Sequence, residues 1–274
     1  MVVNERTRAS MDVAPRTAAF YDHVITALED EQIPFMLGGA FAYEVYTDIG
    51  GRTKDLDVFL HPRDVDAAMA ALAKRGYETE MKARHWLGKI MSGRDFVDVI
   101  FGSGNGLAFV DDGWFEHARP AEVLGHEVRL IPAEEMLWSK AFIMERERYD
   151  GADIAHLIRV GGRTMDWRRL VDRFGPQWPV LLAHVVLYDY VFPTERGRVP
   201  DWVRSELLGR AADGTLDPAV VDDHVCFGTT LSRAQYLPDV ESGGYRDGRL
   251  RPHGLLDEAD VEHENERMRK ELDL

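Results

Sequence analysis

The stretch that decides the fold is Thr53-Lys54-Asp55-Leu56-Asp57-Val58-Phe59-Leu60, in which two aspartates stand one residue apart at the start of an apolar run. This pattern indicates a β-strand, and side chains two residues apart on a strand lie on the same face of the sheet. Two carboxylates on one face can hold a divalent cation, because Mg²⁺ prefers carboxylate oxygens together with water and phosphate. An isolated Asp-x-Asp pair is more often an acidic turn at a strand entrance. The flanking sequence therefore has to distinguish a metal-binding pair from such a turn.

A glycine turn precedes the two aspartates. Ile33 to Leu37 form a short apolar run, Gly38 and Gly39 interrupt it, and Ala40 to Tyr46 are compatible with a helix. The order predicts a strand, a glycine turn and a helix. Glycines at such a turn let backbone N–H groups at a helix start approach a phosphate closely, although the same residues can serve only as a tight connection.

A third carboxylate follows in Phe96-Val97-Asp98-Val99-Ile100, an apolar strand in which an unpaired acid would be costly to bury. A metal ion shared with Asp55 and Asp57 would supply a partner for Asp98. An exposed strand edge or an ion pair with Arg94 would relieve the same cost. Asp95, which lies on the opposite strand face, is the competing candidate for the third ligand.

The periodicity along the chain of 274 residues predicts an α+β fold, with a small mixed-sheet domain over residues 1–130 and a mainly helical domain over residues 131–274. In the first domain the expected helices are Thr17–Gln32 and Val65–Gly76, and the further strands are Tyr77–Ala83, Trp86–Met91, Phe96–Phe101 and Val128–Ile131. In the second domain the expected helices are Glu134–Tyr149, Ala152–Val160, Trp167–Phe174, Pro176–Tyr190 and Asp201–Ala212. The charged run 257–274 is typical of a solvated or frayed helix.

The composition excludes several classes of function and location. Lys and Arg number 33 against 48 Asp and Glu, and the resulting net charge of −15 disfavours a broad basic surface for duplex DNA or anionic membrane. The single cysteine, Cys226, indicates a reducing compartment, and the first sixteen residues lack the apolar core of a signal peptide. The most apolar stretch, Trp178–Phe192, is shorter than the ~20 residues that span a bilayer and is expected to be a buried helix. A cytoplasmic protein without a membrane partner is predicted.

The ordered set Gly38-Gly39, Asp55-x-Asp57 and Asp98 resembles the nucleotidyltransferase superfamily whose best-known member is DNA polymerase beta. The resemblance covers Ile33 to Phe101, and Arg52-Thr53-Lys54 is similar to the family's approach to its carboxylates. It implies that Asp55, Asp57 and Asp98 are the catalytic and metal-binding residues and that Gly38 and Gly39 contact the nucleotide. Many relatives carry Ser or Thr after the glycines, whereas this chain has Ala40, so phosphate binding would rely more on backbone groups and lysine.

The resemblance also implies a reaction. Two Mg²⁺ (or Mn²⁺) ions, roughly 3.5 to 4 Å apart, would lie between the three aspartates. Attack of an acceptor hydroxyl on the α-phosphorus of a nucleoside triphosphate would transfer a nucleoside monophosphate and release pyrophosphate. Asp98 would be best placed to assist deprotonation of the acceptor.

Ser139 to Ile154 resemble the helical region of the abortive-infection branch of this superfamily, which includes bacterial toxins. The resemblance implies that Lys140 contacts the triphosphate, that Asp150 or Asp153 is the accompanying acid, and that the acceptor is RNA, such as a tRNA end, with a cognate antitoxin as a partner. Lys140 is equally compatible with an ordinary surface lysine. Arg148 is equally compatible with a structural ion pair to Asp150 or Asp153.

The acceptor is open at this level. A nucleotidylyltransferase acting on a protein or on a small molecule, as in antibiotic modification, would use the same residues, and a non-catalytic nucleotide- or partner-binding module is a further alternative. With a net charge of −15, an RNA site would have to be a local basic strip. The candidates for such a strip are Arg163, Arg168, Arg169 and Arg173 on one expected helix, or the segment Arg246–Arg251.

Overall fold

The computed structural model describes residues 12–50, 53, 55–214 and 218–271. The chain forms two compact units, one comprising 1–104 and 109–132 and the other comprising 105–108 and 133–274. The main division thus falls between Pro132 and Ala133, where the sequence predicted a boundary near residue 130. No helix in the described part of the chain combines the length and the apolar character that crossing a bilayer requires.

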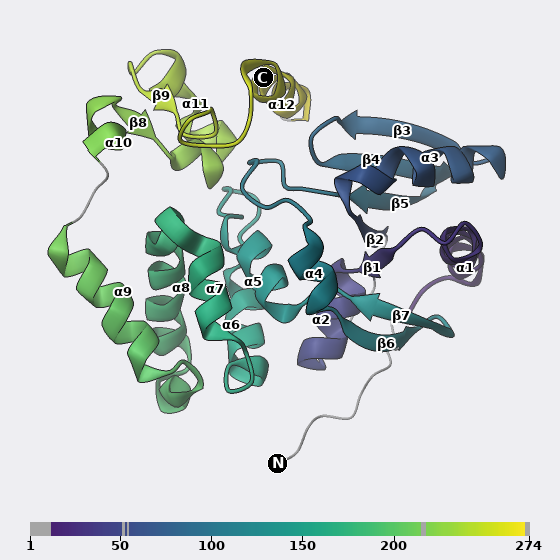
Figure 1. Ribbon diagram of the computed structural model, residues 1–274, viewed down its shortest axis with the longest axis horizontal. Coiled ribbons are helices and arrows are strands. Elements are labelled where there is room, and N and C mark those ends of the chain that lie inside the picture. Colours follow the sequence, from purple (N-terminus) through teal and green to yellow (C-terminus); the bar gives the residue numbers. More distant parts are fainter. Residues whose placement is uncertain (1–11, 51–52, 54, 215–217, 272–274) are drawn as a thin grey trace. The chain divides into compact units, whose positions relative to one another are not determined.

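The first unit is built on a mixed sheet, which confirms the predicted α+β class (Figure 1). In the described residues the sheet has seven strands in the order β3-β4-β5-β2-β1-β7-β6. Strand β2 is parallel to β5 and antiparallel to β1, and β1 is parallel to β7. The strands are β1 (Phe35–Leu37), β2 (Asp55–Leu60), β3 (Glu78–Ala83), β4 (Leu87–Ser92), β5 (Asp95–Ile100), β6 (Arg119–Val123) and β7 (His126–Leu130).

One face of the central strands is buried under helices. On β2 the side chains of Leu56, Val58 and Leu60 are fully buried, and on β5 Val97 and Val99 are equally inaccessible. Helices α1 (Pro15–Asp30) and α3 (Val65–Lys74) pack side by side on this face. Because side chains alternate along a strand, the intervening aspartates of β2 and β5 are directed to the other face.

Two elements of the first unit were not predicted from the sequence. The edge strand β6 contains Pro120, and proline is tolerated in a sheet mainly at an edge, where its missing N–H costs no ladder bond. The short helix α4 (Asp112–Glu116) is capped by Asp111, whose carboxylate accepts a hydrogen bond from the Trp114 N–H (3.3 Å). The Trp114 ring stacks on Phe59 of β2 with 5.7 Å between ring centroids.

The second unit is mainly helical, as predicted. Its helices are α5 (Ala133–Ala141), α6 (Gly151–Gly161), α7 (Trp167–Phe174), α8 (Trp178–Val191), α9 (Asp201–Asp213), α10 (Pro218–Asp222), α11 (Arg233–Glu241) and α12 (Glu258–Glu271). The sequence did not predict the short parallel pair of strands β8 (Val225–Cys226) and β9 (Arg246–Asp247) in this half.

The predicted helix Glu134–Tyr149 is wrong in its second half. Helix α5 ends at Ala141, and the chain then folds back so that Met144 pairs with Tyr149 in an isolated bridge. The Glu145 carboxylate leaves the helical path to accept hydrogen bonds from Ser232 Oγ (2.6 Å) and the Arg233 N–H (3.3 Å). Tertiary hydrogen bonds therefore outweigh the local helix propensity of this charged segment.

The solvated or frayed helix expected over 257–274 is also a packed element in its described part. Helix α12 buries Glu264 completely, and this carboxylate is 2.6 Å from Nη1 of Arg233 on α11. Asn265 accepts a hydrogen bond (2.9 Å) from Arg249, a fully buried arginine that also pairs with Asp247 (2.7 Å). Buried charges in this helix are thus compensated by long-range partners that charge patterning along the chain does not reveal.

Candidate active site

The three predicted carboxylates share one face of the sheet. Asp55 and Asp57 stand two residues apart on β2, and Asp98 on β5 is the direct register partner of Asp57 in the parallel β2–β5 pair. Neighbouring strands lie about 4.8 Å apart, so the two partner residues are immediate neighbours on that face. The structure therefore brings these acids together at the centre of the first unit.

Asp95 is directed to the other face and has different partners. Its carboxylate accepts a hydrogen bond from Thr17 Oγ1 (2.8 Å) and lies 3.8 Å from Arg16 Nε. Both of these residues belong to α1, on the helix-covered side of the sheet. Of the two candidates for the third carboxylate, only Asp98 lies beside Asp57.

The glycine turn lies directly against Asp57. The Gly38 N–H donates a hydrogen bond to the Asp57 carbonyl oxygen (3.0 Å), and Gly39 begins helix α2 (Gly39–Thr47) with a φ of +53°. A Cβ on Gly39 would lie 1.6 Å from Asp57 Oδ2. Glycine is needed here both for the left-handed backbone and for the space that the carboxylate occupies.

Thr53, which the sequence placed only in the approach to the carboxylates, has a direct contact with one of them. Its hydroxyl lies 3.0 Å from Asp55 Oδ1 and 2.9 Å from the Asp55 carbonyl oxygen, and it orients the carboxylate at the start of β2. A threonine two residues before an aspartate at a strand entrance is a recognisable signal for such a local bond. Arg52 and Lys54, the other residues of the predicted approach to the carboxylates, lie outside the described residues.

The aspartates set up a negative field that reaches through the sheet. Burial raises the pKa of the Tyr21 phenol on α1 well above its ordinary value, and the nearby carboxylates raise this pKa further. In order of effect, those carboxylates belong to Asp55, Asp95, Asp57 and Asp98. Excess negative charge of this kind favours the binding of a cation on the face of the sheet that carries Asp55, Asp57 and Asp98.

The donor set suits Mg²⁺, because it consists of carboxylate oxygens that share one face. The carboxylates are, however, engaged with protein groups. Asp98 Oδ1 lies 2.7 Å from Lys89 Nζ, and Asp55 is bonded to Thr53. In the described ranges, no three side chains of His, Cys, Asp or Glu form a group that could hold a metal ion as they stand.

The second predicted cluster lies within the helical unit. Lys140 Nζ on α5 is 2.9 Å from Asp150 Oδ2 and 2.7 Å from Asp153 Oδ2, so the lysine contacts both of the acids between which the sequence did not choose. Arg148 Nε donates to Asp150 Oδ1 at 3.0 Å. The lysine is not an ordinary surface residue, because its ammonium is bound by two carboxylates and its side chain is mostly shielded from solvent.

Asp150 is expected to make the helical unit sensitive to acid. Burial works to raise the pKa of Asp150, but hydrogen bonds from Arg148 and the charge of Lys140 prevail, so the pKa lies below its ordinary value of 3.8. A lowered folded-state pKa stabilises the protein above the unfolded-state pKa, and this contribution is lost as the pH falls through the folded-state pKa. Asp150→Asn should therefore lower the free energy of unfolding by about 1 to 3 kcal/mol at pH 7, and by progressively less as the pH falls below 3.8 towards the lower folded-state pKa.

Urea unfolding at pH 7, 5 and 3 checks this expectation. Asp201→Asn is the matched control, because the Asp201 side chain is fully exposed and lies as far as 4.0 Å from Arg204. An equal loss of stability for Asp150→Asn at all three pH values would contradict the electrostatic role of Asp150.

The predicted basic strips are largely engaged within the protein. Arg169 and Arg173 on α7 both contact the completely buried Glu135 of α5. Arg168 is 3.4 Å from Glu206 and stacks on Trp202, while Arg163 lies outside α7. In the other segment Arg249 is fully buried, and Arg246 is 3.5 Å from Asp223. The expectation that all four arginines share one helix is thus wrong, because Arg163 precedes α7, and two of the other three neutralise a buried glutamate.

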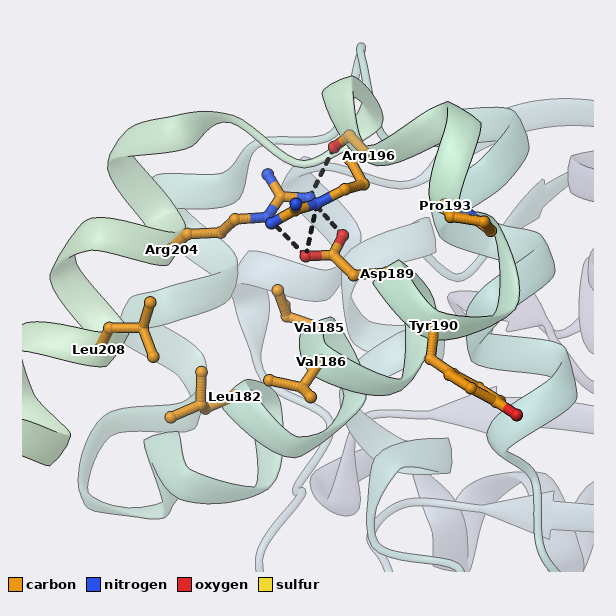
Figure 2. A pocket seen from close by; sticks show the side chains of 9 residues that line it. All are labelled: Leu182, Val185, Val186, Asp189, Tyr190, Pro193, Arg196, Arg204 and Leu208. Carbon is orange, nitrogen blue, oxygen red and sulfur yellow. Dashed lines mark hydrogen bonds and ion pairs between the residues drawn. The ribbon is translucent and has the colours of Figure 1, made fainter.

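Helix α8 is only half buried, in contrast to the buried helix predicted from its apolar sequence. Val186 is 55% and Tyr190 84% exposed, and they border a groove of about 500 Å³ (Figure 2). At one end of the groove Asp189 pairs with Arg204 (2.7 Å) and Arg196 (3.2 Å). The groove is lined by Leu182, Val185, Val186, Asp189, Tyr190, Pro193, Arg196, Arg204 and Leu208.

A family model described as "uncharacterised nucleotidyltransferase" matches residues 4–176, which is well over half of the chain. The chain belongs to this nucleotidyltransferase family. The match includes the glycine turn and all three carboxylates of the first unit, and it extends to the Lys140 cluster. It confirms the superfamily predicted from the sequence, whereas it does not distinguish the abortive-infection branch.

Solved structures with a similar arrangement are distant in sequence. The antibiotic-resistance factor ANT(2'')-Ia is 11% identical, with a TM-score of 0.42 over 74% of this chain and 100% of that one. The lincosamide adenylyltransferase LnuA is 15% identical, with a TM-score of 0.39 over 54% and 99%. A putative nucleotidyltransferase from Thermotoga maritima is 12% identical, with a TM-score of 0.37 over 47% and 85%. No curated protein is significantly similar to the chain in sequence.

Proposed function

We propose that this protein transfers a nucleoside monophosphate from a nucleoside triphosphate to an acceptor hydroxyl, releasing pyrophosphate. The observation that carries the proposal is the register pairing of Asp57 with Asp98 beside the Gly38-Gly39 turn. Asp55, Asp57 and Asp98 would hold Mg²⁺ or Mn²⁺, which would supply charge neutralisation at the triphosphate and at the attacking oxygen.

The glycine turn supports the binding of phosphates. Helix α2 begins at Gly39, and the first N–H groups of a helix have no partner within the helix, so they are donors for an anion. With Ala40 in place of a hydroxyl residue, these backbone donors carry more of the phosphate binding. The left-handed Gly39 keeps the carboxylate of Asp57 close to this helix start.

Lys140 and Asp153 are proposed nucleotide-binding residues on the strength of the resemblance of Ser139–Ile154 to the abortive-infection branch. The Lys140 ammonium already bonds Asp150 and Asp153, so contact with a triphosphate requires it to exchange one of these carboxylates for a phosphate. Such an exchange keeps the charge of the lysine paired throughout. An RNA acceptor and an antitoxin partner are likewise implied only by the resemblance of Ser139–Ile154 to the abortive-infection branch.

For the acceptor we infer a small molecule. An RNA would need free cations for its phosphates, and the net charge of −15 leaves only local strips as candidates. Within those strips Arg169 and Arg173 are held by Glu135, and Arg249 is fully buried. A small-molecule acceptor does not need a row of arginines to bind a phosphate backbone.

Incubation with each α-labelled nucleoside triphosphate and a cell extract tests both parts of the proposal. We expect label in small molecules only with Mg²⁺ or Mn²⁺, and resistance of that label to ribonuclease and protease. Label that ribonuclease releases would replace the small-molecule acceptor by RNA, and label that only protease releases would indicate a protein acceptor. Absence of label with any nucleotide, in extracts and with purified candidate acceptors, would contradict the transferase activity and favour a binding module.

A further inference from the structure

Lys89 lies in one row with two of the carboxylates. In the antiparallel β4–β5 pair Lys89 is the register partner of Asp98, and in the parallel β5–β2 pair Asp98 is the register partner of Asp57. Register partners on neighbouring strands point to the same face of a sheet. This face therefore carries one positive and two negative side chains in a row across strands β4, β5 and β2.

The lysine is held firmly in this row. Its Nζ is 2.7 Å from Asp98 Oδ1 and lies 3.8 Å from the centroid of the Phe96 ring, so the ammonium has an ionic and an aromatic contact. The side chain of Lys89 is 23% exposed and that of Asp98 is 17% exposed. A partly shielded ion pair of this length is stronger than an exposed surface pair, because less water screens the two charges.

The strand order gives this contact a direction. Strand β5 lies between β4 and β2, so Asp98 has Lys89 on the strand to one side and Asp57 on the strand to the other. We propose that Lys89 is the resting cation of Asp98 and that a divalent cation can bind between Asp57 and Asp98 only when Lys89 releases that carboxylate. The inference rests on the proposed function, and it makes Lys89 a positioning residue that sets the affinity for the metal.

The physical reason is charge balance. Two carboxylates on adjacent strands repel one another when no cation is present, and the ammonium relieves that repulsion in the metal-free protein. The same ammonium competes with a metal ion for Asp98.

The test is Mn²⁺ binding without nucleotide, measured by electron paramagnetic resonance of the free ion. We expect Lys89→Met, which keeps the apolar stem on Phe96, to bind Mn²⁺ about tenfold more tightly than the wild type, because one shielded ion pair no longer has to be broken. Lys89→Arg retains the charge and should bind like the wild type. Lys89→Gln should behave like Lys89→Met and serves if that variant does not fold.

Lys82→Met is the matched control, because Lys82 lies on the neighbouring strand β3 with its own acidic partner, Glu80, at 2.6 Å. It should leave Mn²⁺ affinity unchanged. Thermal unfolding gives a second measurement: Mn²⁺ should raise the unfolding temperature of Lys89→Met more than that of the wild type.

Unchanged or weaker Mn²⁺ binding by both neutral variants would overturn the role of Lys89 while leaving the metal assignment intact. Asp57→Ala separates the two questions, because it should abolish Mn²⁺ binding in the wild type and in Lys89→Met alike. If Asp57→Ala bound Mn²⁺ normally, the metal site of the proposed function would itself be wrong.

Discussion

Replacing Asp57 by asparagine is expected to reduce nucleotidyl transfer on the order of 10³-fold, which is the loss typical of removing a major electrostatic contact to a transition state. Asp57 is the central carboxylate, since it follows Asp55 on β2 and faces Asp98 across the strand pair. Asparagine keeps the shape of the side chain and removes its charge. The buried side chains of β2 are untouched, so we expect the fold to persist.

Calorimetric titration of ATP, GTP, CTP and UTP, with and without Mg²⁺, provides the measurement together with a transfer assay. Asp95→Asn is the matched control, because this acid is on the other face and bonds Thr17. It should retain transfer, whereas Asp98→Asn should lose it. Nucleotide affinity that is equal in EDTA, or full transfer by Asp57→Asn, would contradict the metal assignment.

The shared face of Asp55, Asp57 and Asp98 could be predicted from the sequence because its signals are local. The alternation around Asp57 and Asp98 fixes which side chains share a face, and the two glycines mark the end of β1 and the start of α2. What remained hidden was the pairing across strands. The contact between Lys89 and Asp98 depends on β4 lying next to β5 in register, and periodicity along one strand carries no information about its neighbour.

In the helical unit, too, the local sequence pattern does not reveal which distant elements pack against a helix. Average hydropathy predicted that α8 is buried, but only one face is covered and Tyr190 stands almost fully exposed at the rim of the groove. Charge predicted that α12 is solvated, but Glu264 is buried against Arg233. In both helices the outcome depends on which neighbours pack against them, and those neighbours are distant in sequence.

The sequence predicts the nucleotidyl-transfer chemistry proposed for Asp55, Asp57 and Asp98, but it does not predict the acceptor. The arginine strips appeared suitable for RNA because the sequence does not show that Glu135 contacts both Arg169 and Arg173. A buried glutamate without a cation would be costly, so these arginines stabilise the helical unit first. The engagement of these arginines within the unit is the reason for proposing a small-molecule acceptor.

Replacing Gly39 by alanine should abolish transfer and lower the free energy of unfolding by roughly 2 to 5 kcal/mol, the sum of left-handed backbone strain and overpacking. The added Cβ would lie 1.6 Å from Asp57 Oδ2, so the carboxylate or the helix start has to move. Either movement separates Asp57 from the N–H groups at the beginning of α2. Urea unfolding and a transfer assay measure the two effects.

Gly76→Ala is the control that separates the effect of backbone strain from the effect of displacing the Asp57 carboxylate. Gly76 has a φ of +88°, and among the described residues no atom outside its immediate chain neighbours lies within 4 Å of the place that a Cβ would take. This substitution therefore introduces backbone strain without a collision, and it should cost about 1 to 2 kcal/mol of stability and leave transfer intact. If Gly39→Ala lost no more activity than Gly76→Ala, the close approach of the glycine turn to Asp57 would have no catalytic role. A larger loss for Gly39→Ala than for Gly76→Ala would show that the position of the Asp57 carboxylate requires a residue without a Cβ at position 39. The sequence alone does not reveal this requirement, because a glycine needed only for a tight turn gives the same local pattern.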